Sequence, residues 1–340
     1  MKVKKYGFAV LFAIVLFVFT GYLLADTFLI SRVYTVVEQA QTPVGQEESE
    51  TVEFVLSQPT AQPEATEQAE TTAQPDVTEQ TEAAAQPTAE ALAIAPVSDE
   101  TSYSDGNIAI ALSTYRIADT TVYVADVQLS SADYLKTAFA QSAYGRNVTE
   151  KTSSIASSVD AILAINGDYY GAQRSGYVIR NGVLYRSSSS GSEDLVIYAD
   201  GSFGIVNEND VTAEALLASG AWNVLSFGPA LVADGTVAVG VNDEVGKAMA
   251  SNPRTAIGMI DDLHYVFAVA DGRTSASEGL SLYELVTFLQ ELGVKTAYNL
   301  DGGGSSSMVF MGNLINNPTT NGKRTSERSV SDIVYIGYGA

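Results

Sequence analysis

The 340 residues contain no cysteine and a single histidine, His264. The absence of cysteine excludes disulfides, thiol nucleophiles and thiolate metal sites. The scarcity of histidine excludes His-rich metal clusters, and a Ser-His-Asp triad would have to use His264. This residue alternates with apolar neighbours in HYVFAVA, so we predict a structural role for it. Catalysis, if present, must rest on carboxylates, Arg, Lys, Tyr, Ser or backbone amides.

Basic residues are also scarce: 18 Lys and Arg stand against 40 Asp and Glu, which gives a net charge of −22. A chain this acidic repels phosphate backbones, so we predict no nucleic-acid partner. A small anionic ligand could still bind in a local basic pocket.

Charge is absent from Tyr6 to Ala25, an apolar run that follows Lys2, Lys4 and Lys5. Such a run is long enough to cross a hydrocarbon core of about 30 Å. We predict that residues 1–30 are a cytoplasmic tip and an uncleaved signal anchor, a single pass in the cell membrane. The lysines stay in the cytoplasm, so the C-terminal part is extracellular. A cleaved signal peptide is the alternative, and it leads to the same compartment.

Residues 31–102 have too few apolar side chains to form a core. Lys and Arg are missing from Glu38 to Ser102, acidic residues are frequent, and TAQP or AAQP recurs at 60–63, 72–75 and 84–87. A twelve-residue unit without apolar periodicity has no face to stack in a repeat fold. We predict a disordered acidic stalk.

Residues 103–340 alternate apolar runs with Gly, Asn and Asp turns, which predicts a strand-rich single globular domain of the α+β class. Ser281 and Glu284 predict a capping box at the start of the longest helix. The predicted helices span 149–157, 213–218 and 281–292. The predicted strands span 107–112, 121–128, 161–166, 177–180, 195–198, 256–260, 264–269, 296–300, 307–311 and 333–337.

Four polar or glycine-rich segments directly follow strand-like runs. They are INGDYY at 165–170, NPRTAIG at 252–258, VADGR at 269–273 and NLDGGGSSS at 299–307. Any one of them could be an ordinary turn. Four with the same placement favour a site at the rim of a sheet.

The segment NLDGGGSSS could bind an anion, because three consecutive glycines allow close approach and their N–H groups can form a concavity. It lacks the Lys-Ser/Thr ending of a P-loop and is not GxGxxG, so nucleotide binding is not indicated. Arg254 and Arg273 could each grip phosphate oxygens with two donors, or could form surface ion pairs.

The candidate acids and bases are Asp168, Asp271 and Asp301, which follow strands, and Glu278, which precedes the long helix. A pair of carboxylates is the usual machinery of glycoside hydrolysis. Sequence does not say which of these face each other. Tyr169, Tyr170 and Tyr177 could stack on a sugar or pack at the rim.

Together these segments resemble the phosphodiester glycosidase family. The resemblance also includes FGPALV at 227–232, GLSLYEL after DGR, LDGGGSSSMV and ER-x-V around 327–330, and it covers most of residues 160–335. It implies a bacterial, membrane-anchored member that hydrolyses a sugar-1-phosphodiester to free sugar and phosphomonoester. The site residues it implies are Asn166, Gly167, Asp168, Arg254, Asp271, Arg273, Asp301, Gly302, Gly303 and Gly304.

In the mechanism that follows, the arginines and glycine amides hold the leaving phosphate, and Asp301 or Asp168 activates water or steadies the cationic ring. We expect a glycan substrate with sugar-phosphate links, such as a cell-wall glycopolymer or exopolysaccharide, and no cofactor. The competing interpretations are a non-catalytic glycan-binding module and an envelope scaffold. The sugar, the aglycone, any metal requirement and the oligomeric state stay open.

Overall fold

The structure is a computed structural model that describes residues 7–34, 97–243 and 251–339. Most of the predicted stalk, residues 35–96, lies outside the described residues. The predicted stalk is described only at its two ends, where it forms the short strands β1 (Arg32–Val33) and β2 (Val97–Ser98). The sheet structure therefore begins before residue 103, where we expected the domain to start.

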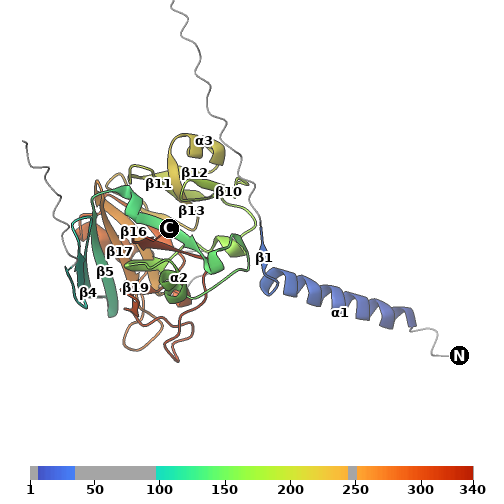
Figure 1. The fold of residues 1–340 in the computed structure, drawn as a ribbon. Coiled ribbons are helices and arrows are strands. Elements are labelled where there is room, and N and C mark those ends of the chain that lie inside the picture. The colour runs from blue at the N-terminus through green and yellow to red at the C-terminus, as the bar shows by residue number, and fades with distance from the viewer. Residues whose placement is uncertain (1–6, 35–96, 244–250, 340) are drawn as a thin grey trace, which may run out of the picture. The chain divides into compact units, whose positions relative to one another are not determined.

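The predicted anchor is helix α1 (Gly7–Phe28), the blue helix in Figure 1. Its segment Ala9–Thr27 is the one candidate membrane span among the described residues, by length and composition, and none of it is buried. A uniformly apolar helix has no polar face to present to water, which suits a lipid environment.

All strand pairs are antiparallel, and three sheets make up most of the fold. The largest has the order β15 (Thr236–Val237), β14 (Ala230–Ala233), β18 (Thr296–Leu300), β16 (Arg254–Asp261), β17 (His264–Ala270), β5 (Thr120–Leu129), β4 (Ile108–Ile117), β3 (Ser102–Ser104), β2.

The two smaller sheets have five strands each. One has the order β10 (Val183–Arg186), β9 (Val178–Arg180), β13 (Ala221–Leu225), β11 (Glu193–Tyr198), β12 (Phe203–Asn207). The other has the order β20 (Asn313–Leu314), β19 (Met308–Phe310), β8 (Leu163–Asn166), β21 (Asp332–Ile336), β6 (Leu135–Phe139). Strand β1 pairs only with β7 (Gly145–Arg146).

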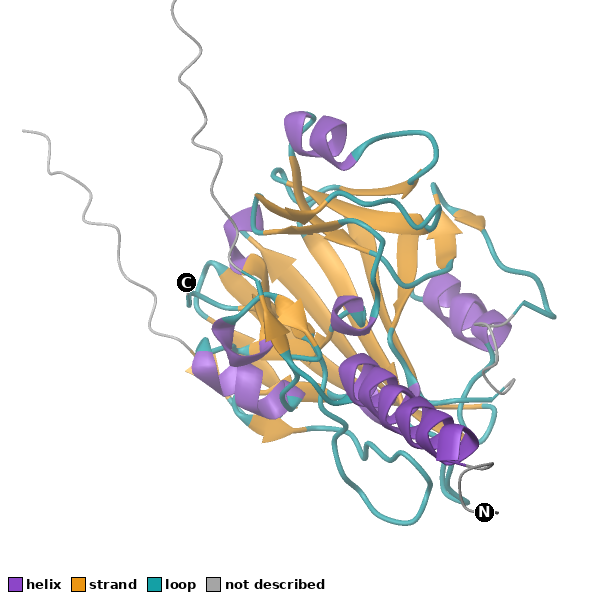
Figure 2. Ribbon diagram, turned by 90° about the vertical axis from the view of Figure 1, so that its right-hand side faces the viewer, coloured by secondary structure: helices purple, strands orange, loops and turns teal. Residues whose placement is uncertain are grey.

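Each sheet buries one face in a shared core and the other under a helix, so the strands lie together and the helices outside them (Figure 2). Strand β17 shows the principle. Tyr265 and Phe267 enter the shared core, whereas Val266 and Ala268 pack under helix α4 (Leu282–Glu291). A strand buried on both faces reads as a continuous apolar run.

Helices α2 (Thr152–Ser158) and α3 (Ala213–Ala218) cover the two smaller sheets. The capping box of α4 is confirmed: Ser281 accepts from the Glu284 N–H, and Glu284 accepts from the Ser281 N–H. Short 3-10 turns occur at 132–134, 140–142, 170–172 and 303–305.

The α+β prediction is confirmed, and every predicted strand and helix forms within a few residues of its expected bounds. Sequence reasoning missed the strands of two or three residues β1, β2, β3, β7, β15 and β20, and also the longer strands β6, β10, β12, β13 and β14. The longer strands have four or five residues, and some carry polar side chains, as in LKTAF of β6. Strands β6 and β13 pair with strands that are distant in sequence, whereas β10 and β12 pair with the strand just before them, and in each case the partner defines the strand more than its own pattern does.

Candidate active site

Antiparallel pairing brings three of the predicted segments together at one end of three central strands of the largest sheet. Leu300, the last residue of β18, pairs with Thr255 at the start of β16, and Arg254 pairs with Ala270 at the end of β17. DGGG follows β18, DGR follows β17 and NPR leads into β16, so the three segments lie at the same end of neighbouring strands. Sequence order alone scatters them along the chain, whereas register brings them together.

A pocket of about 180 Å³ opens at this end of the strands. It holds three arginines and one aspartate. Its lining residues are Phe227, Asn252, Pro253, Arg254, Arg273, Asn299, Leu300, Asp301, Gly302, Gly303 and Arg328. Of the predicted site residues, Arg254, Arg273, Asp301, Gly302 and Gly303 line it, whereas Asn166, Gly167, Asp168, Asp271 and Gly304 do not.

Asp301 is the one carboxylate in this lining. Its carboxylate accepts from Arg328 Nη2 at 2.9 Å and from Ser305 Oγ at 2.6 Å. Burial raises the pKa of Asp301, and the positive charge of Arg328 partly opposes that rise. A carboxylate whose pKa is raised and which lies at a pocket wall can serve as a base, or it can stabilise a positive charge.

Arg273 adopts a left-handed backbone conformation, with φ of 62°. Strain of this kind in a non-glycine residue often marks a functional site. Its guanidinium donates to the Thr320 carbonyl at 2.7 Å and to Asn252 Oδ1 at 3.1 Å. Burial and the nearby charge of Arg328 lower the pKa of Arg273. Two guanidinium groups that repel each other beside a pocket favour an anion between them.

Arg254 is buried, and its Nε donates to the Leu280 carbonyl at 2.8 Å. Guanidinium groups stay charged in proteins, so the described lining residues carry three positive charges against at most one negative charge. This local excess contrasts with the net charge of −22 on the whole chain. The pocket therefore suits an anion, in particular phosphate, whose oxygens match the planar donors of arginine.

The glycine segment is only partly available as an anion cradle. The Gly303 N–H donates to the Pro253 carbonyl at 2.8 Å, so this amide is already engaged. Gly303 has φ of 64°, and a Cβ placed there would lie 2.8 Å from Arg273 Nη2. The left-handed backbone therefore favours glycine here, and a Cβ would displace the tip of the Arg273 guanidinium. Gly304 accepts from the Arg328 N–H through its carbonyl and lies behind the pocket wall.

Asn166 and Gly167 do not line the pocket. They hold the backbone of Asp301 in place by hydrogen bonds. Asn166 Nδ2 donates to the Asp301 carbonyl at 2.6 Å, and its Oδ1 accepts from Thr255 Oγ1 at 2.8 Å. The Asp301 N–H donates to the Gly167 carbonyl at 3.3 Å. A Cβ on Gly167 would lie 2.2 Å from a carboxylate oxygen of Asp332, so no larger residue fits.

Asp168 is fully buried and does not reach the pocket. It pairs with Arg180 at 2.8 Å, and the same Nη2 atom of Arg180 contacts Asp332 at 2.8 Å. The N–H groups of Tyr170 and Ser226 also donate to Asp168. Burial and the charge of Asp168 raise the pKa of Asp332. These contacts join the segment after β8, the end of β9, the start of β21 and the residue after β13, as a structural ion pair does.

Asp271 also faces away from the pocket. It accepts from the Asn317 N–H at 2.9 Å and from the side-chain amides of Asn316 and Asn317 at 3.1 Å each. Asn316 in turn donates to the Ser306 carbonyl. Asp271 therefore ties the segment after β20 to the end of β17, and it supports the glycine loop indirectly.

Sequence reasoning did not name Arg328, although it noted the ER-x-V segment that contains it. Arg328 donates to Asp301, to Ser305 Oγ at 2.8 Å and to the Gly302 carbonyl at 3.1 Å. The available signal was an arginine inside a segment of the resemblance. His264 contacts Asp126 on β5 and does not line the pocket, as its predicted structural role requires.

No group of three or more His, Asp or Glu side chains that could hold a metal ion occurs within residues 7–34, 97–243 and 251–339. The pocket residues offer donors and one carboxylate, which is an anion-binding set.

Comparisons with known proteins bear on the family and the fold. Residues 160–337 match the phosphodiester glycosidase family. The SPbeta prophage-derived uncharacterized protein YomE of Bacillus subtilis (strain 168) is 30% identical over 201 residues, 57% of this chain and 31% of that protein. Mus musculus N-acetylglucosamine-1-phosphodiester alpha-N-acetylglucosaminidase is 41% identical over 66 residues, 19% of this chain and 13% of that protein. The chain thus spans about a third or less of these curated relatives.

A solved structure shows the same fold. It is the catalytic domain of zebrafish N-acetylglucosamine-1-phosphodiester alpha-N-acetylglucosaminidase, auto-inhibited by its pro-peptide. The match has a TM-score of 0.54 at 22% identity and covers 68% of this chain and 83% of that one.

Proposed function

The chain belongs to the phosphodiester glycosidase family, and on that premise we propose that it hydrolyses a sugar-1-phosphodiester in the pocket formed by Arg254, Arg273, Asp301 and Arg328. The products are a free sugar and a phosphomonoester. The observation that carries this proposal is the meeting of three arginines and one buried carboxylate in about 180 Å³. That volume is smaller than the roughly 300 to 1,000 Å³ of drug-sized ligand sites, and it suits a phosphate group with part of one ring.

The pocket residues divide the reaction between them. The arginines hold the phosphate and stabilise the charge that develops on its bridging oxygen as the bond from C1 to that oxygen breaks. The electron pair of that bond stays on the phosphate, which leaves as the monoester. Because the leaving group is already a stabilised anion, protonation by a general acid is less important.

Asp301 acts on the other side of the broken bond. Its carboxylate takes a proton from water as the water oxygen bonds to C1, and the anion also stabilises the oxocarbenium-like sugar. The proton then passes to solvent, which restores the carboxylate. Arg328 and Ser305 orient Asp301 for this step. Asp168 and Asp271 support the loops and take no part in the bond changes.

The chain order suggests where this reaction occurs. We propose that residues 1–30 anchor the protein, that residues 31–102 extend the catalytic part from the membrane, and that residues 103–340 act outside the cell. The apolar helix α1 supports the anchor. An extracellular substrate with sugar-1-phosphodiester links would be a cell-wall glycopolymer or an exopolysaccharide.

The test uses the full chain in a neutral detergent, incubated with a panel of sugar-1-phosphodiesters, with free reducing sugar as the readout. We expect release from at least one substrate, and competitive inhibition by inorganic phosphate. Arg273→Lys keeps the charge and loses the planar fork, so it should release less sugar. Binding of a panel member without any release would instead support the competing glycan-binding module.

A further inference from the structure

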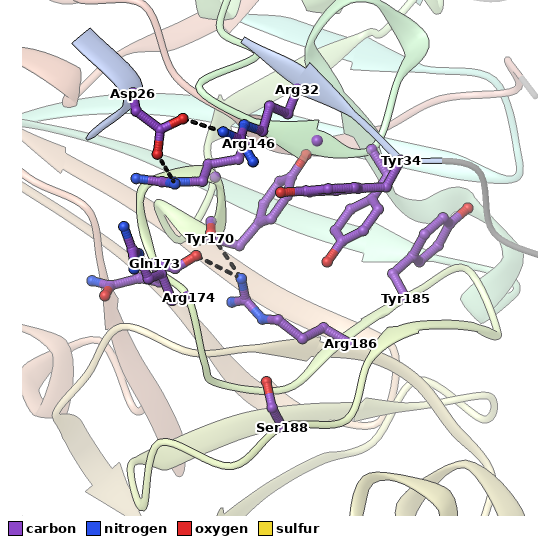
Figure 3. Close-up of a pocket in the computed structure, with 13 residues that line it drawn as sticks. Asp26, Arg32, Tyr34, Arg146, Tyr170, Gln173, Arg174, Tyr185, Arg186 and Ser188 are labelled. Carbon is purple, nitrogen blue, oxygen red and sulfur yellow. Dashed lines mark hydrogen bonds and ion pairs between the residues drawn. The ribbon is translucent and has the colours of Figure 1, made fainter. Parts of the chain in front are cut away.

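A second and larger pocket lies between the segment from Asp26, near the end of α1, to Tyr34 and the loops around η4 (Tyr170–Ala172), as Figure 3 shows. Its volume is about 630 Å³, within the usual range for small-molecule sites. Four arginines and four tyrosines dominate its lining, and Asp26 is the one acidic side chain among the described residues there. They are Arg32, Arg146, Arg174, Arg186, Tyr34, Tyr144, Tyr170 and Tyr185.

The positive charge of this pocket is poorly compensated. Asp26 contacts both Arg32 and Arg146, the latter at 3.6 Å. The buried Nε of Arg146 has no hydrogen-bond partner among the described residues. Arg174 is exposed and makes no ion pair with any described residue. The lining therefore has unused donors and a net positive charge, as an anion site requires.

Arg186 strengthens this argument, because it is partly buried and its hydrogen bonds are to neutral groups. It donates to the carbonyls of Tyr170 at 3.1 Å and Gln173 at 2.9 Å (Figure 3), and to the carbonyl of Gly176 at 2.6 Å. Burial lowers the pKa of Arg186. A cation held this way is stabilised by a bound anion.

Aromatic rings form the other side of the pocket. Tyr144 stacks on Tyr170 with 5.4 Å between ring centroids, and it lies 5.0 Å from Tyr185 and 5.7 Å from Tyr34. Such rings offer flat apolar faces and polar edges. A sugar ring also has apolar faces and a polar edge. A ligand with both a ring and a phosphate therefore fits this lining better than phosphate alone.

The pocket must also lie close to the end of the apolar helix. Tyr34 follows Phe28, the last residue of α1, by six positions. At about 3.3 to 3.6 Å for each extended residue, these positions lie within roughly 20 Å of each other. If α1 crosses the membrane, the pocket is within reach of the lipid headgroups.

We propose that this pocket binds a phosphate-bearing sugar or cyclitol ring, either free in solution or as the headgroup of a membrane lipid. The arginines hold the phosphate and the tyrosines hold the ring. The site is separate from the hydrolytic pocket and shares no lining residue with it. It therefore does not depend on the proposed reaction.

The test measures the Kd of glucose 6-phosphate by calorimetry, with the full chain in phosphatidylcholine nanodiscs. This probe has no phosphate at C1, so the proposed reaction cannot consume it. We expect Arg174→Gln to raise Kd about tenfold, the effect of losing one charge-assisted contact. Arg116→Gln removes an exposed arginine outside both pockets and should leave Kd unchanged. Arg273→Lys weakens any binding of the probe in the hydrolytic pocket, so the binding that persists in this variant belongs to the second pocket.

A second arm distinguishes the sources of the ligand. Phosphatidylinositol in the nanodiscs weakens binding of the free probe if the lipid headgroup enters the site. An unchanged Kd assigns the site to soluble sugar phosphates. The proposal is overturned if wild-type protein does not bind the probe, or if Arg174→Gln and Arg116→Gln have equal effects. Loss of probe binding in Arg273→Lys also overturns it, because that places the probe in the other pocket.

Discussion

Asp301 and Asp168 look alike in the sequence, yet they lie in different environments. Each follows a buried strand, each precedes or follows glycine, and each pairs with an arginine at 2.8 to 2.9 Å. The side chains of Asp168 and Arg180 are 0% and 2% exposed, whereas those of Asp301 and Arg328 are 12% and 41% exposed. The first pair joins loops inside the fold, and the second opens onto a pocket.

The difference shows that exposure of the arginine partner separates a structural aspartate from a candidate catalytic one. A fully enclosed pair has no room for substrate and mainly sets loop positions. In a pair with an exposed arginine, a phosphate can replace the water that contacts the guanidinium. The predictions below test this distinction.

The largest expected effect is on stability, from Arg180→Met. This change leaves Asp168 and Asp332 buried without their shared cation. Removing one partner from a buried ion pair costs about 3 to 5 kcal/mol. Urea unfolding of the full chain in detergent measures the loss.

Arg328→Met is the matched control for that experiment. Its ion pair is partly exposed, so its contribution to stability should be at most about 1 kcal/mol. Its effect should appear in sugar release instead. Equal losses of stability in the two variants would contradict the distinction between the pairs.

Arg273→Lys should lower kcat/KM on a sugar-1-phosphodiester by about tenfold or more, because lysine cannot reproduce the planar two-donor contact. Steady-state kinetics at fixed ionic strength measure the change. The same substitution at Arg116 should leave kcat/KM at the wild-type value. A wild-type value in Arg273→Lys would assign this residue to loop structure only.

Gly303→Ala should reduce both stability and phosphate affinity. The left-handed backbone costs about 1 to 2 kcal/mol for a residue with a Cβ, and the new methyl group would displace Arg273. Gly312→Ala shares the backbone cost, with φ of 78°, but its Cβ meets nothing within 4 Å. Melting temperatures should fall in both variants, whereas inhibition by phosphate should weaken only in Gly303→Ala. Weakening in both would remove the argument for displacement.

The smallest expected effect is on pH dependence. Asp301 acts as a base only when ionised, so kcat/KM falls as the pH drops through its pKa. Burial raises this pKa, which places the fall above the ordinary aspartate value of about 3.9. Arg328→Gln removes a charge that lowers the pKa, so the fall should move to higher pH. A shift to lower pH would show that another group controls the profile.

The fold was largely predictable because its strands either are buried on both faces and read as apolar runs, as in β17, or alternate between buried and partly exposed residues, as in much of β5. The capping box of α4 could be identified from Ser281 and Glu284 alone. The short strands β13 and β14 could not be identified from their own residues, because they are defined by pairing with strands that are distant in sequence. Val97 and Ser98 pair with Ser104 and Tyr103 in a local hairpin that their two residues alone are too short to indicate.

The site was predictable as a set of segments but not as a geometry. Asp168, Asp271 and Asp301 share one sequence pattern, and only strand register and burial distinguish them. The direction of each side chain depends on partners such as Arg180, Asn317 and Arg328, which are distant in sequence. A single sequence does not give those distances.

The most direct test of the central claim is release of reducing sugar by Asp301→Asn, beside Asp261→Asn as a matched control on the exposed end of β16. The amide cannot accept a proton from water, so turnover should fall by about 10² to 10⁴. Binding of a non-hydrolysed phosphonate analogue and the melting temperature should stay near the values of the control. Wild-type turnover in a folded Asp301→Asn would contradict the account, because the pocket would then lack its proposed base.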